Sequence, residues 1–264
     1  MSFDDKVVIV TGAAQSIGKA AAVEFAKQGA VVYCLDLQRS VSETADVITA
    51  EGGRAEFQRL DVTDQAGWYD LVERVRSERS KLDILVNCAG FVQKGNIEDT
   101  SYEEFQRSFD VNVGGVFKSM RAAVPLMRVR SKEQGLASII NLSSMAAFNG
   151  LPMFSAYAAS KAAVWSLTRT AALEFARLKY PVRVNAIHPA TIDTEMTRAV
   201  MRMSIQSGED EETIVQQMIA QHPSGRLGSV EDVVFAIMYL ADERSSFTTG
   251  FSLTVAGGRG AGEW

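Results

Sequence analysis

The stretch Val7-Val8-Ile9-Val10-Thr11-Gly12-Ala13-Ala14-Gln15-Ser16-Ile17-Gly18 decides the fold. Four consecutive β-branched residues predict a strand that is covered on both faces, because a one-sided strand would alternate apolar and polar residues. A glycine-containing turn follows, and then apolar residues at helical spacing up to Gly29, which suits the end of a helix. This order predicts the first unit of a parallel α/β sheet.

The same alternation continues along the chain. Further strands are expected at residues 30–35, 55–60, 82–87, 137–142, 182–187 and 251–255. Helices are expected at residues 18–28, 41–51, 65–78, 101–129, 155–177 and 230–240. Parallel strands need crossovers, which are almost always right-handed, so helices should cover both faces of the sheet. We therefore predict one α/β domain over residues 1–264, a Rossmann-type doubly wound parallel sheet of about seven strands.

Composition excludes several classes of protein. The chain has 264 residues, 47% apolar composition and a net charge of −5, which allows a large core and excludes a disordered chain. It contains no long basic block and no uncharged apolar run of about 18 residues, so neither nucleic acid nor a membrane is an expected partner. Cys34 and Cys88 lie in apolar runs without metal-ligand spacing, which favours buried core thiols and no metal site. With no secretion signal at its start, the protein is expected to be cytoplasmic.

Residues 190–223 interrupt the alternation. They are polar, place four acidic residues after Gly208, and carry four methionines. We expect a mobile helical insertion that covers a substrate site.

The turn at residues 11–18 has the properties of a pyrophosphate site. Amide groups at the start of a helix point toward the turn, and glycines allow close approach of a phosphate. Asp36 ends the second strand, 24 residues after Gly12, where a carboxylate can accept both ribose hydroxyls and repel a 2′-phosphate. These features favour NAD over NADP, although Arg39 is close enough in sequence to neutralise part of the charge. The turn alone is weak evidence, and an ordinary turn remains an alternative.

Tyr157 and Lys161 open a predicted helix at a spacing of four residues, which puts both on one face. A nearby ammonium group lowers the pKa of a phenol, so Tyr157 could act as a general acid or base. An ordinary surface pair has the same spacing. Ser144, which follows a buried strand, should emerge at the same edge of the sheet, where its hydroxyl could bind a substrate oxygen.

Order and spacing together resemble the short-chain dehydrogenase/reductase family, from Lys6 to Gly258. The resemblance implies that Tyr157 exchanges the proton with the substrate oxygen, which Ser144 positions. It implies that Lys161 lowers the pKa of Tyr157 and holds the nicotinamide ribose, and that Asn112 supports a water-linked proton relay. The implied NAD-binding residues are Gly12, Gln15, Ser16, Ile17, Gly18, Asp36, Leu37, Asp61, Val62, Asn87, Ala89, Gly90, Tyr157, Lys161, Pro189, Ile192 and Thr194.

Three positions depart from the usual family pattern. Ser16 and Ala190 each replace a glycine, and Cys88 replaces the second asparagine of the Asn-Asn-Ala-Gly signature. All three side chains are small, so we expect altered cofactor affinity rather than lost function.

The expected substrate pocket is mostly apolar. Its candidate residues are Phe91, Gln93, Ser144, Met145, Ala146, Met153, Phe154, Tyr157, Met196 and Met201. Because no arginine falls clearly among them, a neutral alicyclic, aromatic or steroid-like secondary alcohol is favoured over an anionic substrate. Residues 184–189 also resemble bacterial hydroxysteroid and secondary-alcohol dehydrogenases. His188 is interpreted as structural and His222 as exposed.

The leading hypothesis is an NAD-dependent secondary-alcohol dehydrogenase/ketone reductase. One alternative is an NADPH-dependent 3-oxoacyl reductase, which shares the catalytic residues, and another is a non-catalytic NAD(H)-binding sensor. The long predicted helices at residues 101–129 and 155–177 have several apolar faces, and relatives commonly pair them, so a homotetramer is expected.

Overall fold

Seven parallel strands form one sheet in a computed structural model that describes residues 2–130, 134–206 and 210–262. Their order across the sheet is β3-β2-β1-β4-β5-β6-β7, so the order in which strands are added reverses between β1 and β4 while all strands stay parallel. The predicted doubly wound sheet is confirmed. The strands are β1 (Val7–Thr11), β2 (Val31–Asp36), β3 (Arg54–Arg59), β4 (Ile84–Asn87), β5 (Ala137–Leu142), β6 (Val182–Pro189) and β7 (Ser252–Val255).

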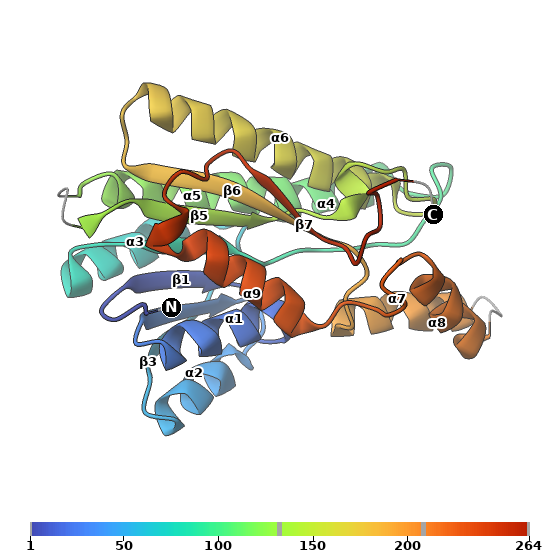
Figure 1. Cartoon of the computed structure of the whole chain (residues 1–264), viewed down its shortest axis with the longest axis horizontal. Helices are drawn as coiled ribbons and strands as arrows, with labels where there is room; N and C mark the ends of the chain where they lie inside the picture. Colours follow the sequence, from blue (N-terminus) through green and yellow to red (C-terminus); the bar gives the residue numbers. More distant parts are fainter. Residues whose placement is uncertain (1, 131–133, 207–209, 263–264) are drawn as a thin grey trace.

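Helices cover both faces of the sheet (Figure 1). One face packs against α1 (Ser16–Lys27), α2 (Val41–Ala50) and α9 (Val230–Ala241). The other packs against α3 (Gln65–Arg79), α5 (Gly115–Met127) and α6 (Ser155–Arg177). The remaining helical segments are α4 (Tyr102–Phe109), η1 (Asp110–Gly114), η3 (Met145–Ala147), α7 (Glu195–Gln206), α8 (Glu211–Ala220) and η4 (Glu243–Ser245).

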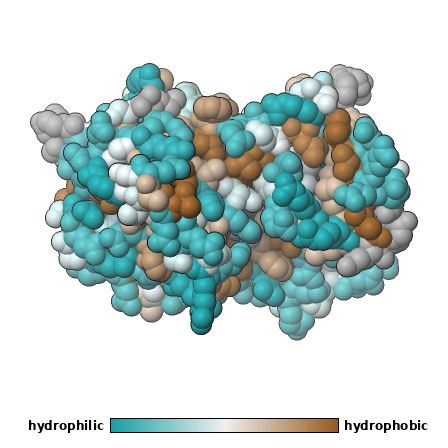
Figure 2. Space-filling view, turned by 90° about the horizontal axis from the view of Figure 1, so that it is seen from below, coloured by the Kyte–Doolittle hydropathy of each residue, from teal (hydrophilic) through white to brown (hydrophobic). Residues whose placement is uncertain are grey.

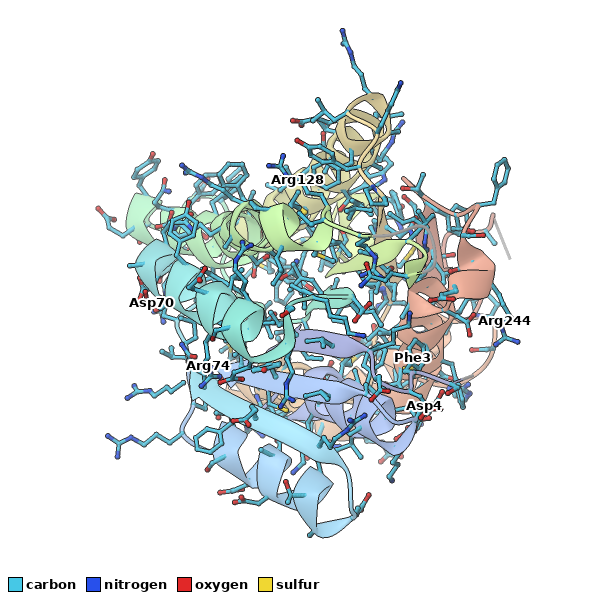
Figure 3. All side chains as sticks on the ribbon, turned by 90° about the vertical axis from the view of Figure 1, so that its left-hand side faces the viewer. Phe3, Asp4, Asp70, Arg74, Arg128 and Arg244 are labelled. Atoms are coloured by element: carbon cyan, nitrogen blue, oxygen red, sulfur yellow. The ribbon has the colours of Figure 1, made fainter. Side chains whose placement is uncertain are left out.

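The hydrophobic core lies on both sides of the central strands. Every residue of β1 and β5 is buried, whereas β3 at the edge alternates exposed and half-buried residues. Continuous apolar runs therefore mark central strands, as expected for a sheet with two covered faces. Phe3 extends this core at the end of the sheet opposite α7 and α8, where Figure 3 shows it beside Asp4 and Arg244.

The long helix expected at residues 101–129 is not one regular α-helix. α4 and α5 are separated by the π-helical segment η1, which contains Asn112. A π-turn inserts one residue into the helical repeat and frequently occurs at functional sites. Apolar spacing does not reveal such an insertion, because the sequence on both sides keeps the helical period.

The insertion after β6 is helical, as expected, and forms α7 and α8 beside the carboxyl edge of the sheet (Figure 1). Gly208 belongs to residues 207–209, which lie outside the described part of the chain. Lys94 Nζ, in the loop after β4, donates to Ser204 Oγ of α7 at 2.6 Å. The insertion therefore contacts the same edge as the candidate site.

The expectation that His222 is exposed is wrong. The ring is buried, and its Nε2 accepts the backbone N–H of Thr191 at 3.3 Å while Nδ1 lies 2.8 Å from the carbonyl oxygen of Met218. His222 thus connects the end of α8 to the segment that follows β6. None of the helices in the described ranges is long and apolar enough to cross a membrane.

Candidate active site

The site begins where β1 and β4 lie side by side, the point at which the strand order reverses. In open α/β sheets, ligands bind in the crevice outside the carboxyl ends of such strands. Thr11 Oγ1 accepts the backbone N–H groups of Cys88 at 3.1 Å and Ala89 at 3.0 Å. This side chain joins the turn after β1 to the turn after β4.

Glycines in the first turn are required by close packing of the backbone. Gly12 has φ of +68°, and a Cβ atom there would lie 2.9 Å from the backbone nitrogen of Ala89. A Cβ atom on Gly18 would lie 2.1 Å from the carbonyl oxygen of Gly12. Ser16 has φ of +49°, in the left-handed region that favours glycine, so this position is one where a glycine would fit with less strain.

A groove of about 840 Å³ runs along this edge of the sheet. It brings together most of the residues implied for the cofactor, from the turns after β1, β2, β3 and β4 and the start of α7. These are Gly12, Gln15, Ser16, Ile17, Gly18, Asp36, Leu37, Asp61, Val62, Ala89, Gly90 and Thr194. Their arrangement suits an extended dinucleotide, with the start of α1 at the pyrophosphate position.

Asp36 has the position expected of a ribose ligand. Its side chain lines the groove and accepts the backbone N–H of Ala14 at 3.1 Å and of Gln38 at 2.9 Å. These two contacts fix the carboxylate at the end of β2. Arg39 is exposed and forms no ion pair with Asp36, so the neutralisation considered above does not occur among the described contacts.

Five implied cofactor residues do not line the groove, namely Asn87, Pro189, Ile192, Tyr157 and Lys161. Asn87 is buried in a polar network, donating to Asn141 Oδ1 at 2.8 Å and accepting from Ser119 Oγ at 2.8 Å. Pro189 and Ile192 are also buried, on the segment that leads into α7.

The two cysteines differ, so the interpretation of both as core thiols is only half correct. Cys34 is completely buried in β2, whereas Cys88 is partly exposed and lines the groove. Burial raises the pKa of the Cys34 thiol to about 12, and burial likewise raises the pKa of Cys88. Both thiols are therefore neutral near pH 7.

Tyr157, Ser144 and Lys161 meet at the carboxyl edge of β5. The Ser144 side chain lies near enough to the Tyr157 hydroxyl to lower the pKa of that phenol. Lys161 Nζ lies 5.7 Å from the centre of the Tyr157 ring and donates to the carbonyl oxygen of Leu142 at 2.8 Å. A Cβ atom on Gly90 would lie 3.5 Å from Lys161 Nζ, which places the ammonium group next to the groove.

The pKa values of this group differ from the sequence-based expectation. Burial raises the pKa of Tyr157, and the nearby Ser144 side chain opposes that rise. Burial also lowers the pKa of Lys161 to about 8. The net shift of the Tyr157 pKa in the chain alone is therefore upward, and the lowering by Lys161 stays a prediction.

Asn112 connects the turn after β4 to α6. Its Oδ1 accepts the N–H of Phe91 at 2.7 Å, and its Nδ2 donates to the carbonyl oxygen of Phe91 and to Ser160 Oγ, both at 2.9 Å. Ser160 Oγ in turn donates to the carbonyl oxygen of Tyr157. The Asn112 side chain therefore links the loop after β4 to the turn of α6 that carries Tyr157.

The candidate substrate residues surround the same edge. Phe91 and Met196 line the groove, and Gly95 pairs with Phe154, which brings the loop after β4 beside the start of α6. Ala146 N–H donates to Ser144 Oγ at 3.1 Å. Met145 is buried, Met153 has φ of +68° and is exposed, Gln93 donates to Glu104, and Met201 is half-buried on α7.

Sequence reasoning missed one wall of the groove. Several side chains from α4 and η1 line it, among them Arg107, whose guanidinium stacks 4.6 Å from the centre of the Phe91 ring. The expectation that no arginine lies among the candidate substrate residues is therefore wrong. The helical spacing of the α4 and η1 side chains along residues 102–111 would have grouped them on one face, but nothing in the sequence shows that this face turns toward the groove. The missed residues are Gln38, Leu60, Thr63, Tyr102, Glu103, Gln106, Arg107, Asp110 and Val111.

This fold and site define a dinucleotide-binding oxidoreductase of the α/β class. A family model described as enoyl-(acyl carrier protein) reductase matches residues 12–259. The chain belongs to the short-chain dehydrogenase/reductase family.

Named relatives agree with this family along nearly the whole chain. The chain is 39% identical over 259 residues to an uncharacterized oxidoreductase of Thermotoga maritima, covering 98% of each chain. It is 35% identical over 256 residues to a cyclopentanol dehydrogenase of Comamonas sp., covering 97% of each. Among solved structures, NAD⁺-bound xylitol dehydrogenase superposes with a TM-score of 0.90 at 32% identity, covering 98% of this chain and all of that one.

Proposed function

We propose that this oxidoreductase transfers a hydride between NAD and a neutral secondary alcohol or its ketone. The observation that carries the proposal is the meeting of Tyr157, Ser144 and Lys161 at the carboxyl edge of β5, next to the dinucleotide groove. A hydroxyl donor and a proton-exchanging phenol at one point suit an alcohol oxygen.

In the proposed mechanism, each side chain has one task. Ser144 Oγ positions the substrate oxygen, and Tyr157 Oη takes the hydroxyl proton as the C–O bond becomes a carbonyl. A nicotinamide held in the groove would supply the acceptor for the hydride that leaves the same carbon. Only the phenolate form of Tyr157 can take the proton, and the positive charge of Lys161 favours that form. Asn112 holds the adjoining turn in place. Ketone reduction is the reverse of these transfers.

NAD is the proposed cofactor because of Asp36. The carboxylate lines the groove where the adenosine ribose would bind, it is fixed by two backbone N–H groups, and Arg39 does not pair with it. A 2′-phosphate placed there would meet a like charge. Gln15, also in the groove, supplies no positive charge to offset that repulsion.

The proposed substrates are cyclic, aromatic or steroid-like secondary alcohols. The loop after β4, the segment before α6 and the insertion α7 bring mainly apolar side chains to the catalytic edge, including Phe91, Phe154 and Met196. The cyclopentanol dehydrogenase similarity agrees with a small cyclic substrate.

Initial rates with a panel of cyclic, aromatic and steroidal secondary alcohols, each with NAD and with NADP, test the proposal. We expect NADH formation with at least one cyclic alcohol, and a higher kcat/KM for NAD than for NADP. A preference for NADP and activity on a 3-oxoacyl thioester would favour the acyl reductase alternative instead. Tight NADH binding without turnover of any panel member would favour a non-catalytic sensor.

We further propose that the chain folds as a single domain and that four copies assemble into a homotetramer. The expected location of this tetramer is the cytoplasm. Large apolar side chains are exposed on α6 and α9, including Leu173 (74% exposed) and Phe235 (72% exposed). Figure 2, seen from the side of α1, α2 and α9, shows hydrophobic residues exposed near the middle of a mostly hydrophilic face. Contact between copies would cover these side chains.

A further inference from the structure

His188, at the end of β6, is a buried histidine that the proposed mechanism does not use. Its side chain is completely buried, and its ring centre lies 4.3 Å from that of Phe148 and 6.2 Å from that of Trp165. Tight aromatic packing alone would be satisfied by a phenylalanine at this position. The two ring nitrogens therefore need a separate explanation.

One nitrogen of His188 contacts the backbone of the candidate catalytic serine. Nδ1 lies 3.1 Å from the carbonyl oxygen of Ser144. A carbonyl oxygen only accepts hydrogen bonds, so Nδ1 must carry the proton and donate. In the neutral ring Nε2 is then a bare acceptor, and it has no hydrogen-bond partner among the described residues. The Nδ1–H group is therefore the part of the ring that contacts the site.

The surroundings keep this imidazole neutral. Burial lowers the pKa of His188, and the charge of nearby Lys161 lowers it further, while the contact with Ser144 opposes the shift. A neutral ring with a fixed Nδ1–H tautomer is a donor of constant direction near pH 7.

The contact fixes Ser144 from a second strand. The Ser144 carbonyl oxygen also accepts Ala147 N–H at 3.0 Å, and Ser144 Oγ accepts Ala146 N–H at 3.1 Å. With His188 added, the peptide after Ser144 is held from β6 as well as from η3. The same serine side chain is the one that lies near the Tyr157 hydroxyl.

We propose that His188 is a positioning residue, whose Nδ1–H donates to the Ser144 carbonyl and thereby fixes the serine hydroxyl against Tyr157. This inference rests on the proposed function, because it concerns the role assigned there to Ser144. It goes beyond a structural role for His188, since it assigns the effect to one N–H group and not to the ring.

Two substitutions separate the N–H group from the ring. His188→Phe keeps the aromatic packing and removes the donor, whereas His188→Asn removes the ring and keeps an amide N–H close to the Nδ1 position. With the fastest alcohol of the panel, we expect the Phe variant to lose about thirtyfold in kcat with little change in NAD KM, and the Asn variant to stay within about threefold of wild type. NADH fluorescence titration and Tm check that both variants are folded.

The opposite order, with Phe tolerated and Asn impaired, would show that the ring matters only for packing and would overturn the proposal. Equal rates for both variants, whether high or low, would overturn it as well. Ser144→Ala and Tyr157→Phe, measured in parallel, test the proposed function itself. If those two retain activity, the proposed function fails, irrespective of the result at His188.

A second measurement on the wild-type chain does not depend on activity. The chain has only two histidines, so long-range ¹H–¹⁵N spectra contain two imidazoles, and the His222→Asn variant assigns them. We expect His188 as a neutral Nδ1–H tautomer at pH 7. An Nε2–H tautomer or a charged ring would contradict donation to Ser144.

Discussion

At the scale of single residues, the candidate site combines buried charge with backbone contacts. Lys161 is buried and donates to the Leu142 carbonyl, and burial lowers its pKa to about 8. A lysine placed for chemistry therefore costs folding free energy while it is charged. This cost predicts a dependence of stability on pH.

Lys161→Met should isolate that dependence. The unfolded chain, with a lysine pKa near 10.5, binds more protons than the folded chain between pH 8 and 10.5. The wild-type free energy of unfolding should therefore rise relative to the variant across this window, by an amount on the order of 3 kcal/mol. Urea titrations at one protein concentration and several pH values measure the difference.

Lys179→Met, on an exposed residue after α6, is the matched control and should show no such difference. A wild-type advantage that stays constant from pH 8 to 10.5 would contradict a lowered pKa at Lys161.

Periodicity in the sequence explains which of the candidate site residues could be predicted. Tyr157 and Lys161 share a helix face, and Ser144 follows a parallel strand, so regular geometry brings them to one edge. Asn87 also ends a strand, yet its side chain turns into a polar network with Asn141 and Ser119. Side-chain direction at a strand end depends on tertiary partners, which the sequence pattern does not contain.

At the scale of elements, the insertion α7–α8 is attached to the sheet edge by His222. The ring accepts Thr191 N–H and contacts the Met218 carbonyl, so it joins both ends of the insertion. An isolated histidine after a helix gives no sequence signal for this role, and its polarity suggested exposure. The sequence likewise gives no signal for the π-helical segment η1, because the helical spacing of apolar residues continues on both sides of it.

His222→Phe should loosen the insertion without affecting the dinucleotide turn. We expect a several-fold higher KM for the alcohol, faster proteolysis within residues 191–223, and NADH affinity within about twofold of wild type. Steady-state kinetics and limited proteolysis followed by mass spectrometry measure these effects. An unchanged cleavage rate and an unchanged alcohol KM would mean that His222 does not anchor the insertion.

At the scale of the whole molecule, the alternating strands and helices made the sheet predictable from the sequence. Seven short strands, most of them apolar, joined by six crossovers in the described chain, leave few topologies open. The oligomeric state is harder to predict from the sequence. Exposed apolar residues indicate a surface that a partner can cover, but they do not identify that partner. Leu173 and Phe235 lie on α6 and α9, which pack on opposite faces of the sheet and so offer two separate contact surfaces.

Light scattering should report a homotetramer at micromolar concentration. Leu173→Glu or Phe235→Glu should each disrupt one contact and yield a smaller species, because a carboxylate would be buried in an apolar interface. Val47→Glu, an apolar to acidic change on α2, should leave the tetramer intact. A wild-type monomer across the micromolar range would rule out the assembly.

The most direct test of the whole account is Tyr157→Phe, which removes a single hydroxyl and keeps the ring. The variant should bind NADH with wild-type affinity and keep its Tm within a few degrees, yet lose about a thousandfold or more in kcat for the fastest alcohol, because no group remains to take the proton. Turnover close to the wild-type rate would contradict proton transfer by Tyr157 and, with it, the proposed mechanism.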